Sequence, residues 1–129
     1  MSGRADPQEE SALQDEQYRL SVEATCTLAR TFFANGYEVA IDDVLEPAAF
    51  ERYWRAALEP LPWALVVVLP SLDDTLRRAH SREKHVLEKH IRTQHARCAE
   101  WDADVRIDTT GLDLEQSLAL VLARSDQPV

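Results

Sequence analysis

The spacing of apolar residues predicts most of the helices in the chain. Over residues 13–34 apolar side chains recur three or four positions apart, which places them on one face of a helix. Asn35-Gly36 is expected to end this helix, because glycine adopts the left-handed conformation that satisfies the last carbonyls. Further helices are predicted over residues 48–58, from Ser71 onward, over 86–101 and from Asp113 onward.

Three short runs have the pattern of β-strands instead. Residues 38–43 are rich in β-forming side chains, residues 64–69 (ALVVVL) are continuously apolar, and residues 104–108 alternate between polar and apolar positions. Helices and strands therefore alternate along the chain, which is typical of a parallel sheet with helical crossovers. We predict an α/β fold in which a parallel sheet of three strands is flanked by about five helices.

The length of 129 residues suits one domain with a single core. Residues 1–12 are small, polar and acidic and are expected to form an N-terminal arm, residues 13–124 the domain, and residues 125–129 a short tail. Because 45% of the residues are hydrophobic and 29% are charged, the composition is that of a folded globular chain.

The charge and the apolar runs exclude several classes of partner. The net charge is −9, whereas nucleic acid favours clustered Lys and Arg, so we expect no nucleic-acid partner. The longest apolar run, residues 63–69, is far below the roughly 20 residues of a membrane helix, and the start of the chain does not resemble a signal peptide. A cytoplasmic protein is therefore predicted, with Cys26 and Cys98 as reduced core residues.

Polar residues follow the predicted strands at their carboxyl ends, where ligands of parallel α/β folds gather. Asp42 and Asp43 end the first strand, and they either hold a metal or substrate or merely cap the following turn. Residues 108–111 (DTTG) form either a ligand-contacting loop or only a turn and helix cap. Arg78 and Arg82 are four residues apart, which places them on one face of the predicted helix. They either bind phosphate or form a solvated helix end.

Four histidines follow one another at intervals of five residues. A five-residue step turns successive side chains by about 140° around a helix, so these side chains point in different directions. We expect no metal site from them. They are His80, His85, His90 and His95.

The segments YEVAIDDV, ALVVVLPSLDDTLRRAHSRE and VRIDTTG together resemble the middle and C-terminal parts of small P-loop kinases. These are kinases of the zeta-toxin, chloramphenicol phosphotransferase and polynucleotide-kinase-like kind, and the resemblance covers residues 13–124. It implies a three-layer fold, AAA-type ATP binding, and transfer of the γ-phosphoryl group of ATP to a small hydroxyl-bearing acceptor. The acceptor stays open between a sugar, an antibiotic, a nucleotide and a peptide.

The resemblance also implies roles for particular residues. Asp42, with Asp43 beside it, would be the Walker-B-type carboxylate near Mg²⁺. Arg78 and Arg82 would be the paired lid arginines that hold phosphoryl oxygens. The loop beside adenine would consist of Asp108, Thr109 and Thr110.

The chain departs from the family at its phosphate-binding loop. It contains only Gly3, Gly36 and Gly111, so no G-x-x-x-x-G-K-[ST] motif is present, and the central strand that precedes that motif in the family is missing. We therefore expect a chain shortened at its N-terminus that is inactive alone. Loss of the central strand would expose a sheet edge, so the alternative hypothesis is a non-catalytic remnant or interaction module that forms homo-oligomers through this edge.

Overall fold

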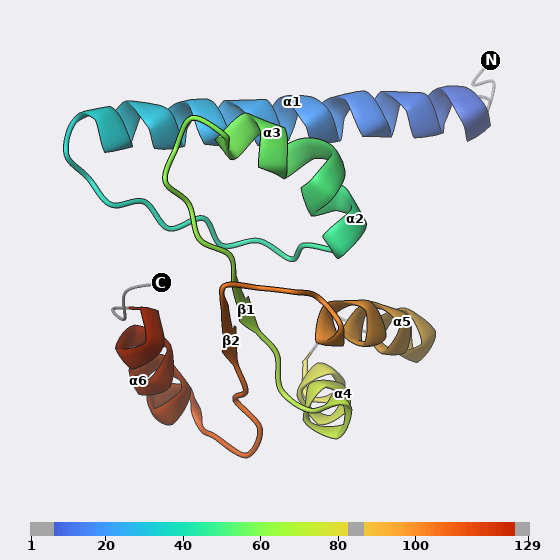
Figure 1. Ribbon diagram of the computed structural model, residues 1–129. Helices are drawn as coiled ribbons and strands as arrows, with labels where there is room; N and C mark the ends of the chain where they lie inside the picture. Colours follow the sequence, from blue (N-terminus) through green and yellow to red (C-terminus); the bar gives the residue numbers. More distant parts are fainter. Residues whose placement is uncertain (1–6, 83–86, 126–129) are drawn as a thin grey trace. The chain divides into compact units, whose positions relative to one another are not determined.

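The computed structural model describes residues 7–82 and 87–125, and the chain divides into two compact units, Met1–Pro62 and Trp63–Val129 (Figure 1). Within these described residues, the first unit contains helices and no strand, and the second contains two parallel strands and three helices. The described residues thus form a mixed α/β structure, as the sequence predicts.

The first unit is built on the long helix α1, Pro7–Ala34, followed by a helical segment over residues 47–58. Gly36, with φ of +89°, ends α1, and its N–H donates to the carbonyl of Phe33 at 3.0 Å. The second segment consists of α2 (Pro47–Ala49), the π-helical turn η1 (Phe50–Trp54) and α3 (Arg55–Leu58).

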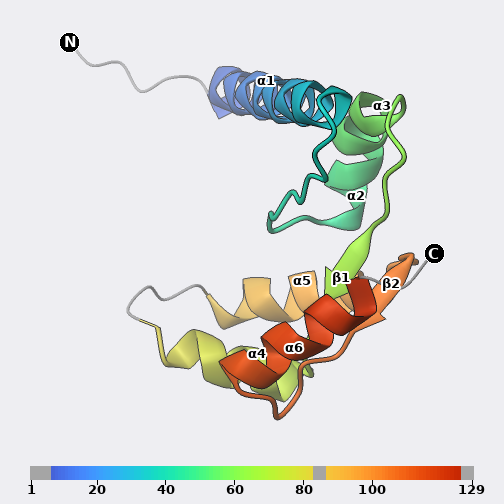
Figure 2. The same cartoon turned by 90° about the vertical axis from the view of Figure 1, so that its left-hand side faces the viewer.

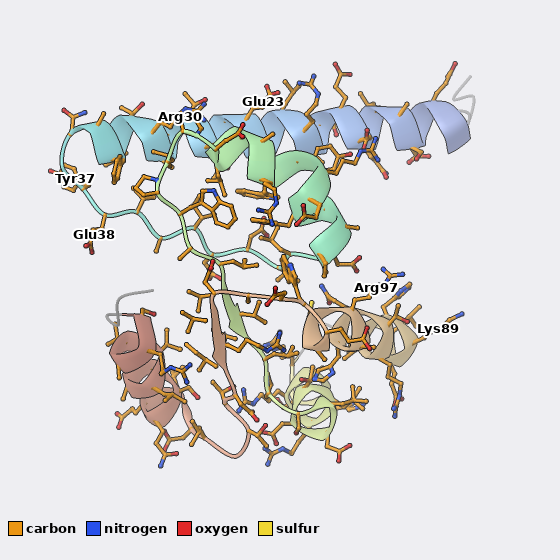
Figure 3. The ribbon with its side chains drawn as sticks, viewed as in Figure 1. Glu23, Arg30, Tyr37, Glu38, Lys89 and Arg97 are labelled. Atoms are coloured by element: carbon orange, nitrogen blue, oxygen red, sulfur yellow. The ribbon has the colours of Figure 1, made fainter. Side chains whose placement is uncertain are left out.

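The two helical segments of this unit share one apolar core. Both segments contribute buried residues at the helical spacing that the sequence shows. Arg30 of α1 adds a polar link, because its Nη1 donates to the carbonyl of Ala57 at 2.7 Å (Figure 3). The buried apolar residues are Val22, Cys26 and Ala29 from α1 and Phe50, Trp54 and Leu58 from the second segment.

The predicted strand over residues 38–43 is wrong. Residues 37–46 connect α1 to α2 without regular secondary structure (Figure 1 and Figure 2), and the side chains of Tyr37, Val39 and Val44 are exposed. A strand is stable only when its backbone groups pair with a neighbour. No strand is paired with this segment among the residues that the structure describes, so its β-forming composition is not sufficient to make it a strand.

The second unit contains β1 (Val66–Val68) and β2 (Val105–Ile107), which pair in parallel with Val67 opposite Arg106. These strands confirm the predictions for residues 64–69 and 104–108, although both are shorter. Parallel neighbours need a crossover connection. Here the crossover contains α4 (Leu72–His80) and α5 (Glu88–Ala99), and α6 (Leu114–Ser125) follows β2.

Helices lie on both sides of the two strands. Figure 1 shows α4 and α5 on one side and α6 on the other. The register places Val67 and Arg106 on the same face, and Arg106 reaches the end of α5. Ile107 projects to the opposite face and is buried, with 2% of its surface exposed. Both faces of β2 are therefore used in packing.

Two further predictions concern the whole chain. Cys26 and Cys98 are free thiols and both are buried, as expected of core cysteines. Within residues 7–82 and 87–125, no helix combines the length and the apolar character that crossing a membrane would require.

Candidate functional site

A pocket of about 290 Å³ lies at the carboxyl ends of β1 and β2. This is the place where parallel strands leave room for a ligand, because the chain turns away from both strands into loops. Its lining combines apolar strand residues with four polar ones. The residues are Val67, Leu69, Pro70, Ser71, His95, Arg106, Ile107 and Asp108.

Ser71 joins the pocket to the start of α4. Its Oγ accepts a hydrogen bond of 3.2 Å from the backbone N–H of Asp74, so Ser71 is the N-cap of α4. Its own N–H donates to Oγ1 of Thr110 at 2.7 Å. The loop after β1 and the loop after β2 are therefore linked directly at the pocket.

His95 projects from α5 to the loop after β1. Its Nε2 lies 2.7 Å from the carbonyl oxygen of Pro70. Because a carbonyl only accepts, Nε2 carries the proton of this hydrogen bond. In the neutral ring, Nδ1 is then the nitrogen that can accept a proton or a hydrogen bond.

Arg106 caps the C-terminal end of α5. Its guanidinium donates to the carbonyls of Ala99 at 2.9 Å, of Cys98 at 3.4 Å and of Trp101. The last carbonyls of a helix lack some of their intrahelical partners, although that of Cys98 also accepts from the N–H of Trp101 at 3.2 Å, and a cation at this end interacts favourably with the helix dipole. The guanidinium of Arg106 is thus bonded to the C-terminal end of α5.

Residues 108–112 form a tight turn between β2 and α6. The Oδ1 atom of Asp108 accepts from the N–H of Thr110 at 2.9 Å and also from its hydroxyl. Both bonds lower the pKa of the Asp108 carboxyl from its ordinary value, and the bond from the Thr110 hydroxyl has the larger effect. Gly111 has φ of +72°, a left-handed conformation that favours glycine.

Arg78 of α4 binds this turn. Its Nη2 donates to the carbonyl of Thr109 at 2.8 Å and to that of Leu112 at 3.3 Å, and its Nη1 donates to Oγ1 of Thr109 at 3.2 Å. The Thr109 residue is almost completely buried. Arg78 also forms an ion pair of 3.4 Å with Asp74, one helical turn earlier.

Asp74 of α4 also binds this turn. Its Oδ2 accepts a hydrogen bond of 2.8 Å from the backbone N–H of Gly111, and its Oδ1 accepts from Arg77. The Gly111 bond is the largest cause that lowers the pKa of Asp74, and the nearby charges of Arg77 and Arg78 add to it. Asp74 is a buried carboxylate, and both of its oxygens accept hydrogen bonds from groups of its own unit.

The predicted site residues fall into different places. Asp108, Thr109 and Thr110 lie together in the turn, and Arg78 contacts them, whereas the side chain of Arg82 is exposed beyond the end of α4. Asp42 and Asp43 lie in the exposed connection of the first unit, where Oδ1 of Asp43 accepts from the N–H of Val44 at 2.7 Å. The structure thus brings together only the second-unit residues of the prediction, without Arg82.

The magnesium ion that the resemblance implies at Asp42 stays a prediction, because such an ion is commonly held by one or two carboxylates together with substrate phosphates. Magnesium is bound through carboxylate and other oxygen ligands. No group of three or more His, Cys, Asp or Glu side chains within residues 7–82 and 87–125 lies close enough together to hold a metal ion. We derive no catalytic step through this ion.

Sequence analysis missed the roles of Asp74, His95 and Arg106. A signal for Asp74 is present, since Ser71 followed three residues later by an acidic residue is the start of a helix-capping pattern, and Asp74 shares a helix face with Arg78. The contacts of His95 and Arg106 depend on loop positions that no local pattern indicates.

Comparison of the chain with protein-family models, with curated proteins and with solved structures finds no match.

Proposed function

We propose that the chain is part of an ATP-dependent phosphotransferase of the P-loop-kinase type, in which the second unit takes the adenosine end of ATP. The observation that carries this proposal is the pocket at the carboxyl ends of β1 and β2, which is lined by Asp108 at the start of the DTTG turn. The resemblance of this turn to the adenine-side loop of small P-loop kinases supports the same assignment. The acceptor would be a small hydroxyl-bearing molecule.

The size and polarity of the pocket favour a nucleoside over a triphosphate. Its volume of about 290 Å³ is at the lower end of the range for pockets that hold drug-sized ligands. The charged side chains near it, Arg106 and Asp108, are bonded within the chain. Of the residues that line the pocket, the backbone of Asp108 and the Nδ1 atom of His95 are then the groups that would contact a base.

The grip on the phosphates is the part that the 129 residues do not supply. The chain has no G-x-x-x-x-G-K-[ST] motif, whose backbone and lysine hold the phosphates in P-loop enzymes. Asp42 and Asp43 belong to the other unit, and Arg78 is bonded to the turn. We therefore expect this chain alone to bind ATP weakly and to transfer no phosphoryl group.

The test is a titration of the ¹⁵N-labelled chain with adenosine and, separately, with ATP. We expect no measurable heat in micromolar calorimetry, and at millimolar ligand we expect shifts confined to the amides of Leu69, Ser71 and residues 108–111, of equal size for the two ligands. Leu69→Trp, which fills the pocket, should abolish the shifts, whereas Leu118→Ala on the exposed side of α6 should leave them unchanged. Shifts elsewhere, or none at all, would refute the adenosine site. Micromolar affinity for ATP would refute the expectation that this chain alone lacks the groups that hold the phosphates.

A second candidate function is an interaction module that pairs through the outer edge of β1. The N–H of Leu69 donates to Ile107 at 2.9 Å and the N–H of Val105 donates to Leu65 at 3.1 Å, so the odd-numbered residues of β1 direct their backbone groups to β2. Val66 and Val68 direct theirs to the opposite edge. These groups have no partner among the residues that the structure describes, and both side chains are exposed.

A second copy of this chain is the partner that suits this edge. Residues 64–69 carry no charge that would repel an identical strand, although the chain has a net charge of −9. In a two-fold antiparallel pairing, Val66 of one copy and Val68 of the other would exchange both of their backbone hydrogen bonds. A three-residue edge forms few such bonds, so we expect a weak dimer.

The molecular mass in solution tests this candidate. Light scattering after size exclusion should show a mass that rises toward that of a dimer with concentration, and Val68→Lys should keep the chain monomeric. Val44→Lys introduces the same charge at a more exposed position outside the sheet and should leave the dimer intact. A wild-type chain that stays monomeric at millimolar concentration would contradict pairing through the edge.

A further inference from the structure

We infer that Asp74 and Arg78 of α4 form one positioning device, which holds the turn over residues 109–112 in place beside the pocket, and that Arg78 influences a bound ligand only through this turn. This inference rests on the proposed function where it concerns the ligand. The role of the pair in holding the turn stands on the contacts of the second unit alone.

The hydrogen bonds of Arg78 leave little of its guanidinium for a ligand. Nη1 donates to Thr109, and Nη2 donates to the carbonyls of Thr109 and Leu112 and to Asp74. Arginine has five N–H donors, in a fixed planar fork. With both Nη atoms directed to the turn and to Asp74, this fork is oriented by the protein itself.

Asp74 completes the device from the neighbouring position on the same helix face. Its carboxylate accepts from the N–H of Gly111 at 2.8 Å, while Arg78 donates to the carbonyls of Thr109 and Leu112. One turn of α4 thus binds a donor and two acceptors of a loop that lies 31 to 37 residues further along the chain. Asp74 and Arg78 are therefore an ion pair whose negative member accepts from an N–H of the loop and whose positive member donates to its carbonyls.

The turn needs such support because of its conformation. Gly111 is left-handed, and only 2% of the Thr109 surface is exposed, so its carbonyl and hydroxyl have little access to water. Buried polar groups without a partner are costly. The turn also fixes the pocket, because Asp108 lines it and Thr110 accepts from the N–H of Ser71 at its border.

The experiment compares Arg78→Lys and Arg78→Ala with Arg77→Ala. Arg77 is the matched control, since it also pairs with Asp74 but has a more exposed side chain and no bond to the turn. In both Arg78 variants the hydrogen bonds that the guanidinium donates to Thr109 and Leu112 are lost, and the turn opens more often. We therefore expect the Gly111 and Leu112 amides to exchange with solvent about tenfold faster. Val105 and Ile107 should keep their protection, and Arg77→Ala should resemble the wild type.

Chemical rescue separates positioning from a general loss of stability. Millimolar guanidinium should restore the slow exchange of Gly111 in Arg78→Ala, where it fills the vacated place, and should not affect the wild type. If Arg78→Ala does not fold, Thr109→Val provides a milder test, because it removes only the Oγ1 acceptor. We expect this variant to show a smaller acceleration at the same two amides.

Ligand titrations of the same variants test how Arg78 influences binding. Positioning predicts that the shifts at residues 108–111 weaken equally for adenosine and for ATP in Arg78→Lys. A loss for ATP alone, with Gly111 still protected, would show direct contact with phosphate and overturn the inference. Acceleration by Arg77→Ala as large as that by Arg78→Ala would also overturn it. If the wild type shows no ligand shifts, the proposed function fails, while the exchange of Gly111 still decides whether the pair holds the turn.

Discussion

The indole Nε1 of Trp54 donates a hydrogen bond of 3.0 Å to the hydroxyl of Tyr18, and this bond joins the π-helical turn η1 to α1. Trp54 is buried, and Tyr18 also packs edge-to-face against Tyr53 with ring centroids 5.1 Å apart. The hydroxyl of Tyr53 donates to Asp15 in turn. Polar groups of both helical segments are therefore paired where the segments meet.

Removal of the Tyr18 hydroxyl should destabilise the first unit. In Tyr18→Phe the buried N–H of Trp54 loses its acceptor, so we expect the free energy of unfolding to fall by about 1 kcal/mol in urea denaturation. Tyr37→Phe is the control, because Tyr37 is exposed and its change should stay within about 0.5 kcal/mol. Equal effects of the two substitutions would contradict a role of the Tyr18 hydroxyl.

The cap that Arg106 provides for α5 should also be measurable. Arg106→Met keeps much of the side-chain volume but removes the guanidinium that donates to the carbonyls of Ala99 and Cys98, and we expect a loss of about 1 kcal/mol. Arg92→Met removes only an exposed pair with Glu88 and should cost at most about 0.5 kcal/mol. A larger loss for Arg92→Met would mean that surface charge, and not capping, stabilises α5.

Two glycines should resist substitution for conformational reasons alone. Gly36 and Gly111 both have positive φ, and a Cβ atom at either position would meet no atom within 4 Å. Because space is not the limit, Gly36→Ala should cost about 1 kcal/mol through the left-handed backbone only. Gly111→Ala should cost at least as much, since a shift of the turn would also weaken the bond to Asp74. If thermal unfolding showed the same Tm for these variants as for the wild type, the left-handed backbone would not be what limits the two positions.

Local patterns in the sequence are sufficient for most of the fold. The apolar spacing locates α1 and the segment over residues 47–58, and the run ALVVVL locates β1. Capping signals are equally local. Asp113 and Gln116, three residues apart, exchange hydrogen bonds at the start of α6, with Gln116 N–H donating to Asp113 at 2.7 Å.

The features that local patterns miss depend on distant neighbours. Residues 38–43 have the composition of a strand, but the described part of the chain provides no strand beside them. The spacing of Arg78 and Arg82 does not indicate that the guanidinium of Arg78 binds Thr109, 31 residues later. Helical periodicity gives the face of Arg78 correctly but contains no information on which loop this face meets.

The pH dependence of stability should depend on Asp74. Its pKa is lowered from the ordinary value of 3.8, first by the N–H of Gly111 and then by Arg77 and Arg78, although burial opposes the shift. A carboxyl whose pKa is lower in the folded state stabilises the fold above its unfolded-state pKa, and this contribution is lost as the pH falls through the folded-state value.

We therefore expect Asp74→Asn to be less stable than the wild type at neutral pH, and the difference to shrink below about pH 4. Asp73→Asn, on the neighbouring exposed position of α4, should follow the wild type at every pH. Urea denaturation between acid and neutral pH measures both variants. A difference between Asp74→Asn and wild type that stays constant down to acid pH would show that the charge of Asp74 is not what holds Gly111, and that only the shape of its side chain matters.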